Sequence, residues 1–309
     1  MVLLTPASGK EVISMPEKEI SLAPLPFFNP RRKVLLIIFS GLFILIAVCL
    51  WGFFMNPELY GPNYAAKRLS PSLVHLFGTD QLGRDMFYRT ISGLSLSIQI
   101  GLLSAVLSSF IALVLGSMSA IYGGKVDYII NYLVDLCMGV PHLILLILIS
   151  IACNGGAIGV ITGVALTHWP ALTRVVRAEV MQVRSAKYVQ LSRHMGKSSW
   201  YIAVRHIIPH VFPQYIVGLI LLFPHAILHE AGITFLGYGL PLDTPAVGII
   251  LSESMKYLSA GMWWLAVFPG IALLITVQLF DIIGDYMKIY IDPVSYTHLR
   301  AHETKANLV

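Results

Sequence analysis

The sequence predicts an all-α membrane protein with six transmembrane helices and both ends of the chain in the cytoplasm. Of its 309 residues, 56% are hydrophobic and 12% are charged, whereas an ordinary soluble domain carries roughly 25% charged residues. This balance excludes a disordered chain and disfavours a water-soluble globule. The charged residues are also missing from five long runs, residues 34–54, 94–122, 136–173, 206–229 and 257–280.

The lengths of these runs set the number of predicted helices. A helix crosses a membrane with about 20 apolar residues, so four of the runs hold one crossing each. The run 136–173 is long enough for two crossings, and the turn sequence Asn154-Gly155-Gly156 separates them. Together the five runs predict six helices.

Lys and Arg residues set the orientation of these helices. Segments 1–33, 123–130, 174–210 and 285–309 hold 5, 1, 7 and 3 of the 21 Lys and Arg residues, 16 in all. Basic residues concentrate in cytoplasmic loops, so these segments are expected to be cytoplasmic. The net charge of +5 is therefore a signal of topology. A nucleic-acid partner is not expected, because it would need a basic face with interleaved aromatic residues on a soluble domain.

This topology divides the chain into consecutive segments. The first helix is expected to remain as an anchor. A signal peptide has a shorter apolar core that a small-residue cleavage site follows, whereas the run 34–54 is longer and is not followed by such a site. The predicted segments are a cytoplasmic N-terminal segment (1–33), the anchor helix (34–54), an extracytoplasmic loop (55–93), a five-helix core (94–284) with a cytoplasmic loop at 174–210, and a cytoplasmic C-terminus (285–293).

The second apolar run carries small residues at four-residue spacing. One stripe is Ser104, Ser108, Ala112, Gly116 and Ala120, and a flanking stripe is Ser97, Gly101, Ala105 and Ser109. Small side chains let membrane helices approach closely, so we expect this helix to pack inside the bundle. Lining of a permeation path is the alternative, and it is compatible with a central position.

Four carboxylates lie near the predicted cytoplasmic helix ends: Asp127, Asp135, Asp281 and Asp285. Paired carboxylates in a membrane can mark proton or cation relays. Lys125 and Lys288 are close to them in the sequence, so solvated or salt-bridged carboxylates are the expectation.

Motifs for metal binding and catalysis are weak. His225 and His229 are one helical turn apart and are candidate metal ligands, but Glu230 is the one local third ligand. We therefore expect hydrogen bonding at a helix end and no resident metal. Gly196-Lys197-Ser198 is similar to the end of a phosphate-binding loop, yet Leu191 stands where its first glycine belongs. Neither a cofactor site nor enzyme activity is predicted for this chain.

The loop 174–210 is basic and amphipathic. Gly196 is expected to end its first helix, and Pro209 to stop its second helix before the fifth membrane helix. The apolar face of the first helix is Tyr188, Leu191 and Met195, and that of the second is Trp200, Val204 and Ile207. Such a hairpin can lie on anionic lipid or dock into a groove of a partner.

Several short motifs occur in one register along the chain. They are Phe77-Gly78-Thr79-Asp80, Gly83-Arg84-Asp85, Tyr122-Gly123-Gly124 with Asp127, Asp135 and Pro141, Trp169 with Arg174, Arg177 and Glu179, Arg205-His206-Ile207-Ile208-Pro209, Phe235-Leu236-Gly237-Tyr238-Gly239 with Pro245 and Gly248, Gly284-Asp285 and Asp292-Pro293. From about residue 25 to 293 the chain resembles the inner-membrane permease subunits of ABC importers of the dipeptide, oligopeptide and nickel family. That family carries Glu-Ala-Ala in its coupling loop, then a glycine, and a proline thirteen residues beyond it. Gly196 and Pro209 keep this spacing, whereas Gln190-Leu191-Ser192 replaces Glu-Ala-Ala.

The resemblance implies a bacterial inner-membrane protein with several partners. These are a second permease, two cytoplasmic ATPases that bind ATP–Mg, and an extracytoplasmic substrate-binding protein, which chiefly selects a peptide, nickel or a metallophore. It places the ATPase contact at Lys187, Tyr188, Gln190, Leu191, Ser192, Gly196, Trp200, Arg205 and Pro209. It places the contact with the binding protein, or the outer loops, at Gly78, Thr79, Asp80, Gly83, Arg84, Asp85, Phe235, Gly237, Gly239 and Pro245.

Residues 294–309 follow the point where the family pattern stops, and we expect them to be a disordered, non-native tail. Two alternatives to a permease remain. An ion-coupled secondary transporter or channel would use Asp135 or Asp281, although proton-driven carriers usually hold a charged residue inside the membrane. An intramembrane enzyme would need a nucleophile and a base that the sequence does not pair.

Overall fold

The computed structural model describes residues 30–291. Most of the predicted N-terminal segment 1–33 and the whole predicted tail 294–309 lie outside the described residues. Within 30–291 the regular elements are helices, with one isolated bridge between Thr79 and Asp85. They are α1 (Pro30–Phe53), two 3-10 turns (Pro57–Tyr60 and Tyr64–Ala66), α2 (Met86–Tyr122), α3 (Gly124–Gly139), α4 (His142–Ala152), α5 (Gly156–Ser185), α6 (Lys187–His194), α7 (Ser199–Ile202), a π-helical turn (Ala203–Ile207), α8 (Ile208–Phe235), α9 (Val247–Met255) and α10 (Trp264–Ile291). The predicted all-α fold is confirmed.

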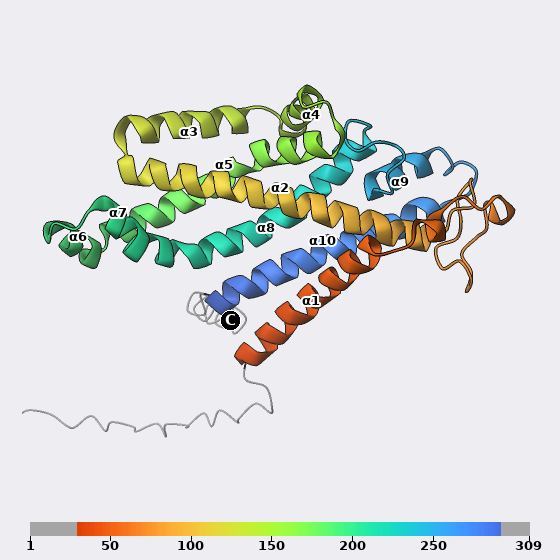
Figure 1. The fold of residues 1–309 in the computed structure, drawn as a ribbon, viewed down its shortest axis with the longest axis horizontal. Helices are drawn as coiled ribbons and strands as arrows, with labels where there is room; N and C mark the ends of the chain where they lie inside the picture. Colours follow the sequence, from red (N-terminus) through yellow and green to blue (C-terminus); the bar gives the residue numbers. More distant parts are fainter. Residues whose placement is uncertain (1–29, 292–309) are drawn as a thin grey trace, which may run out of the picture.

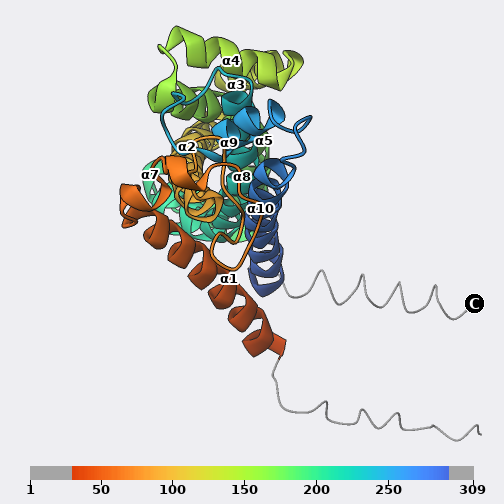
Figure 2. The same cartoon turned by 90° about the vertical axis from the view of Figure 1, so that its right-hand side faces the viewer.

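The long helices form an elongated bundle around α2. α2 packs against α1, α5, α8 and α10, while α3 and α4 lie on the flank opposite α1 (Figures 1 and 2). α6 and α7 form one end of the bundle, which we call the hairpin end (residues 186–207). The loops 54–85 and 236–263, together with α9, form the other end, which we call the loop end.

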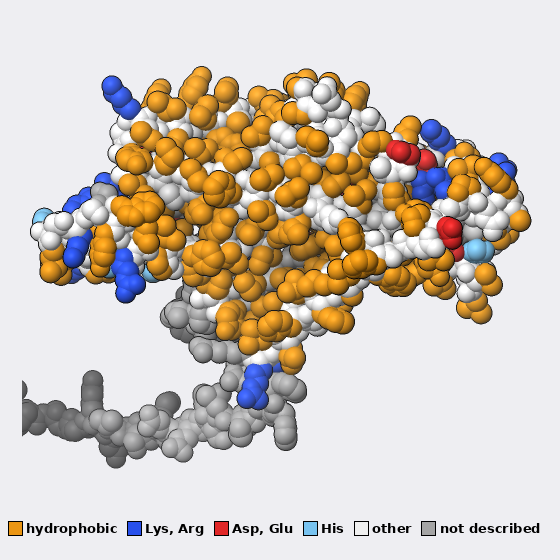
Figure 3. Space-filling view, in the orientation of Figure 1, with side chains coloured by type: hydrophobic (Ala, Val, Ile, Leu, Met, Phe, Trp, Pro, Cys, Tyr) orange, Lys and Arg blue, Asp and Glu red, His pale blue; other side chains and the backbone are white. Residues whose placement is uncertain are grey.

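The surface between these two ends is apolar. Figure 3 shows hydrophobic side chains covering the middle of the bundle, with Lys and Arg at the hairpin end and at the start of α1, and with both acidic and basic side chains at the loop end. On α1, Phe39 and Phe43 are 63% and 73% exposed. A soluble protein rarely exposes so large a continuous apolar surface, whereas a bilayer favours it. The membrane class that the composition predicts is therefore confirmed.

The small residues of α2 lie inside the bundle. Both predicted stripes are buried, from Ser97 to Ala120. A Cβ atom added at Gly101 would meet Ile227 Cγ1 of α8 at 2.6 Å, and one added at Gly116 would meet the Thr173 carbonyl oxygen of α5 at 2.8 Å. The prediction that these residues serve helix packing is confirmed, because they let two neighbouring helices touch the backbone of α2.

The described helices support four or five of the six predicted crossings. By length and composition, α1, α2, the helix Trp200–Phe235 and α10 can each cross a membrane, and α3 with α4 would make a fifth crossing if that bent pair is one span. α5 has 30 residues but carries Arg174, Arg177, Glu179 and Arg184 in its second half. The count of six and the N-in, C-in orientation stay predictions.

The third apolar segment is broken once more than the sequence predicts. The expected break at Asn154-Gly155-Gly156 is present, and all three residues have a φ between 64° and 65°. A second break separates α3 from α4, whose axes differ by 99°. Proline disfavours the helical conformation of the residue before it, and Val140, which precedes Pro141, is extended (φ −92°, ψ 138°).

Pro209 does not stop a helix, contrary to the sequence prediction. α7, the π-helical turn and α8 form one continuous helix from Trp200 to Phe235. Proline lacks an N–H donor and its ring clashes with the carbonyl four residues earlier in a regular α-helix. The π-helical turn Ala203–Ile207 ends two residues before Pro209 and contains Arg205, the residue four positions earlier. Its wider spacing leaves room for the ring.

The close contact of α2 with α5 predicts that one added methyl group at Gly116 destabilises the protein. We expect Gly116→Ala to lower the stability of the detergent-solubilised protein by about 1–3 kcal/mol, because the new Cβ overpacks the contact with α5. Gly232→Ala on α8 is the matched control, since nothing lies within 4 Å of its Cβ position. The midpoint of thermal unfolding measures both variants, and equal midpoints would contradict the packing role of Gly116.

Candidate functional site

The hairpin end is built by two sharp changes of chain direction. Ala186 is extended (φ −64°, ψ 139°) and ends α5, so that α6 starts at once. Gly196 has a φ of +77° and ends α6, as predicted. Its N–H donates to the Arg193 carbonyl (3.0 Å) and the Lys197 N–H donates to the Ser192 carbonyl (3.2 Å). This pair of bonds is a Schellman motif, which satisfies the last carbonyls of a helix.

The hairpin end has one buried face and one exposed face. Val189 and Ile202 belong to the hydrophobic core at 0% and 2% exposure. The four most exposed apolar side chains are Tyr188 (48%), Leu191 (60%), Met195 (70%) and Trp200 (77%). These four residues, which we call the hairpin face, include the predicted stripe of α6. Their exposure leaves an apolar surface that the described chain does not cover.

The predicted apolar face of the second hairpin helix is wrong at Ile207. Trp200 and Val204 are 77% and 45% exposed, but Ile207 is buried at 5%. The π-helical turn holds more residues per turn than an α-helix, so the helical register shifts between Trp200 and Ile207. Ile207 consequently points into the core and cannot line the hairpin face.

The predicted docking residues lie along this hairpin and are tied to the rest of the bundle. Lys187, Tyr188, Gln190, Leu191 and Ser192 are on α6, Gly196 is in the turn, Trp200 is on α7, Arg205 is in the π-helical turn and Pro209 is in the first turn of α8. Ser192 Oγ lies 3.2 Å from His206 Nε2, which joins α6 to the π-helical turn. Arg184 donates to the Ala120 carbonyl (2.6 Å) at the end of α2.

An ion-pair cluster with two buried and two partly buried members organises the loop end. Asp80 is 1% exposed and accepts hydrogen bonds from the guanidinium groups of Arg84 and Arg89. The same two arginines reach Glu253 of α9, at 2.9 Å and 2.8 Å. Buried charges of this kind are stable when each one is paired and hydrogen-bonded. The cluster therefore fastens the loop 54–85 to α2 and α9.

The other motif residues of this loop are also internal supports. Asp85 caps α2 by accepting from the Phe87 N–H (2.8 Å), and its second carboxylate oxygen is 2.7 Å from His75 Nδ1. The Thr79 hydroxyl donates to the Ala66 carbonyl (2.5 Å). Gly78 and Gly83 both have positive φ values, 70° and 78°. Arg89 and Glu253 complete the cluster but have no motif around them, so sequence reasoning missed them.

The second predicted outer group lies at the same end. Phe235 ends α8, and Gly237 follows with a φ of +86°. The Gly156 N–H donates to the Gly239 carbonyl (3.1 Å), which joins this turn to the start of α5. The Pro245 carbonyl oxygen packs against Gly93 of α2, where an added Cβ would meet it at 2.4 Å. The structure thus brings both predicted outer groups to one end.

Three of the four helix-end carboxylates are salt-bridged, as expected. Asp127 receives two hydrogen bonds from Arg177, at 2.6 Å and 2.7 Å. Asp135 is paired with Arg174 and Asp285 with Lys288. The ion pairs of Asp127 and Asp135 join α3 to α5, a role that the sequence spacing did not reveal.

Glu230 is a correction to the sequence prediction. The charge-free run ends just before Glu230, which would place this carboxylate at the start of an outer loop, but α8 continues to Phe235 and Glu230 is 0% exposed within it. The Thr234 hydroxyl donates to its Oε1 (3.1 Å). A carboxyl group therefore does lie inside the bundle, one residue beyond the charge-free run.

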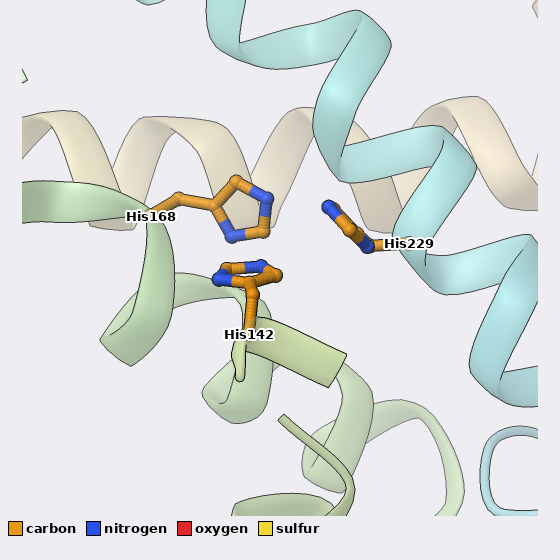
Figure 4. A group of neighbouring side chains, drawn as sticks. All are labelled: His142, His168 and His229. Atoms are coloured by element: carbon orange, nitrogen blue, oxygen red, sulfur yellow. The ribbon is translucent and has the colours of Figure 1, made fainter. Parts of the chain in front are cut away.

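The histidines form a group that the sequence reveals in part. His229 meets His142 of α4 and His168 of α5, as Figure 4 shows. His225, the other candidate, is exposed and lines the same cavity. His142 and His168 were missed because they come from separate helices, so no local spacing links them.

Comparison with known proteins agrees with these features. Residues 112–293 match the family described as binding-protein-dependent transport system inner membrane component. The chain is 30% identical over 258 residues to the dipeptide transport system permease protein DppC of Bacillus subtilis, covering 82% of this chain and 81% of that protein. It is 31% identical over 292 residues to the oligopeptide transport system permease protein OppC of the same organism, covering 93% and 94%.

Solved structures show the same fold. The chain superposes on a structure of the MetNI methionine ABC transporter in an inward-facing conformation with a TM-score of 0.55 and 17% identity, covering 66% of this chain and 97% of that one. A second crystal form of that transporter gives a TM-score of 0.52. On these grounds the chain belongs to the binding-protein-dependent transport system inner membrane component family, as a multi-pass inner-membrane permease of the peptide group of ABC importers.

Proposed function

We propose that this chain is the transmembrane permease of an ATP-driven importer of peptides. It would form the translocation path with a second permease, receive substrate from an extracytoplasmic binding protein and dock two cytoplasmic ATPases that bind ATP–Mg. The observation that carries the proposal is the match to peptide permeases over most of the chain. A hairpin with an uncovered apolar face supports the docking part of the proposal.

The hairpin face has the chemistry of a docking surface. Tyr188, Leu191, Met195 and Trp200 offer exposed apolar side chains, and the basic residues Lys187, Arg193, Lys197 and Arg205 surround them, all of them exposed. Binding energy concentrates on a few buried aromatic or arginine anchors. Trp200 is the most exposed large side chain of the hairpin face and is the proposed anchor. The coupling contact then needs no Glu-Ala-Ala sequence, only the turn at Gly196 and this face.

The connections of the hairpin suggest how a movement would cross the membrane. α6 follows α5 after one residue, and α7 continues into α8 without interruption. α5 and α8 both run to the loop end, where Gly156 is bonded to Gly239. A shift of the hairpin on ATPase closure would therefore move both helices as rigid elements.

The loop end is the proposed contact for the binding protein. Asp80, Arg84, Arg89 and Glu253 hold the loop 54–85 in place, and its exposed residues, among them Leu73 at 98%, form the surface. The motif residues of the loop 54–85 would support this surface from below, because Gly78, Thr79, Asp80, Gly83 and Asp85 are themselves buried.

ATP dependence tests the proposal against an ion-coupled carrier. We expect the full complex in liposomes to take up a labelled di- or oligopeptide only with binding protein and ATP, and to continue when a protonophore collapses the ion gradient. Glu230 is the buried carboxyl that a proton-driven carrier would use. We therefore expect the Glu230→Gln variant to keep the ATP-driven uptake. Uptake that stops with the protonophore and needs no ATP would overturn the permease proposal.

Trp200→Asp tests the docking assignment. We expect substrate-stimulated ATP hydrolysis by the assembled complex to fall at least about tenfold, because losing an anchor costs about 2 kcal/mol or more. Trp200→Phe should retain most of the activity. Tyr128→Asp, a change at a 74% exposed aromatic residue on α3, is the control. Normal coupling in Trp200→Asp would exclude the hairpin face as the dock.

Arg89→Met tests the role of the ion-pair cluster. The change leaves Asp80 and Glu253 with Arg84 as their one remaining cation, and breaking a buried pair costs about 3–5 kcal/mol. We expect faster proteolysis of the loop 54–85 and weaker stimulation of ATP hydrolysis by the binding protein. Lys288→Met removes an exposed pair instead and should change neither readout, because such pairs contribute about 0–1 kcal/mol. Full stimulation in Arg89→Met would contradict the supporting role.

A further inference from the structure

Three histidines from three different helices face one another inside the bundle. His142 is the first residue of α4, His168 lies in the middle of α5 and His229 lies in α8 (Figure 4). Their ring centroids are 4.5 Å, 4.4 Å and 5.0 Å apart. One nitrogen atom of each ring lies within 4.8 Å of the corresponding atoms of the other two. Three imidazole nitrogens are therefore close enough for one ion to reach all of them after small side-chain rotations.

The hydrogen bonds of the group leave its metal-binding nitrogens free. His168 Nδ1 is 3.0 Å from the Val164 carbonyl oxygen, so Nδ1 carries the proton and Nε2 keeps its lone pair. A bond of this kind to a backbone carbonyl orients a histidine that ligates metal. Nε2 of His142 and Nε2 of His168 are buried without a hydrogen-bond partner among the described residues. A buried polar atom without a partner costs free energy, and coordination to a cation would satisfy both atoms.

The surroundings fit a transition metal better than a hard cation. The group lines a cavity of about 270 Å³ together with Met138, Thr167, Pro170, Ala171, Leu222 and His225. None of these lining residues is Lys or Arg, so no fixed positive charge repels an ion, and none is Asp or Glu. Imidazole ligands favour zinc, nickel and copper, whereas calcium and magnesium require oxygen ligands. His225 lies at the same cavity as a possible fourth ligand.

The fold itself creates this meeting of side chains. The break at Val140 and Pro141 turns the chain through 99° and places His142 at the start of α4. If α3 continued straight past Gly139, His142 would lie further along the axis of α3 and not at the start of α4. An ion held by the three rings would link α4 to α5 and α8, the two helices that run to the hairpin end.

We propose that His142, His168 and His229 form a binding site for one divalent transition-metal ion, with Zn²⁺ or Ni²⁺ as the fitting ions. Ligand nitrogens around Zn²⁺ lie about 2.1 Å from the ion, so the three rings would draw together by small side-chain rotations on binding. The inference concerns this chain alone and does not depend on the proposed peptide import.

Titration calorimetry with ZnCl₂ on the tag-free full chain in detergent tests the site. We expect one saturable site per chain and no comparable site for MgCl₂. His168→Gln and His229→Gln should each weaken the affinity at least about tenfold, because the loss of even a supporting contact of a ligand costs 10–100-fold. His210→Gln is the matched control, since His210 is an exposed histidine at the other end of α8 and should leave the affinity unchanged. No saturable binding, or equal affinity in His168→Gln and His210→Gln, would overturn the proposal.

X-ray absorption at the zinc edge tests the same site without any substitution. We expect the zinc-loaded full chain to show three imidazole nitrogens at about 2.1 Å. A thiolate shell would instead assign the ion to Cys49, Cys137 or Cys153, which are all free, and would contradict the three-histidine site. This measurement stays decisive even if a histidine variant fails to fold.

Discussion

The whole bundle depends on the close approach of α5 and α8 to the small side chains of α2. Between apolar helices in a bilayer, association comes from packing and hydrogen bonds, since lipid tails are as apolar as the helices themselves. Gly101 lets α8 place Ile227 against the backbone of α2, and Gly116 does the same for Thr173 and Val176 of α5. α5 and α8 connect the two ends of the molecule, and both of them pack against α2.

The two ends use charge in different ways. At the loop end Asp80 and Arg89 are buried and Glu253 is partly buried, so their charges pair within the protein and hold a loop. At the hairpin end the basic side chains stay exposed around an apolar face, and the hairpin is fixed by hydrogen bonds such as those of Ser192 with His206 and of Arg184 with the Ala120 carbonyl. The first arrangement suits a stable platform. The second suits a surface that a partner covers.

Sequence reasoning succeeded where a single stretch of chain decides the outcome. Charge-free runs predicted α1, α2, α8 and α10, and Gly196 predicted the end of α6. It failed where distant contacts or unusual turns decide. Pro209 continues a helix because a π-helical turn precedes it, and Glu230 stays helical and buried because Thr234 and the surrounding helices enclose it. Arg89 and Glu253 are partners because the fold brings α2 next to α9, and their positions in the sequence do not indicate this contact.

By itself the sequence determined the membrane class, the all-α fold, the family resemblance and the small-residue face of the central helix. These follow from composition, periodicity and short motifs, which act along the chain. The tertiary structure alone decided the burial of Asp80 and Arg89 in the ion-pair cluster and the meeting of His142 with His168 and His229. The physical reason is that each of these depends on how separate helices pack, and no local spacing records which side chains from different helices face one another.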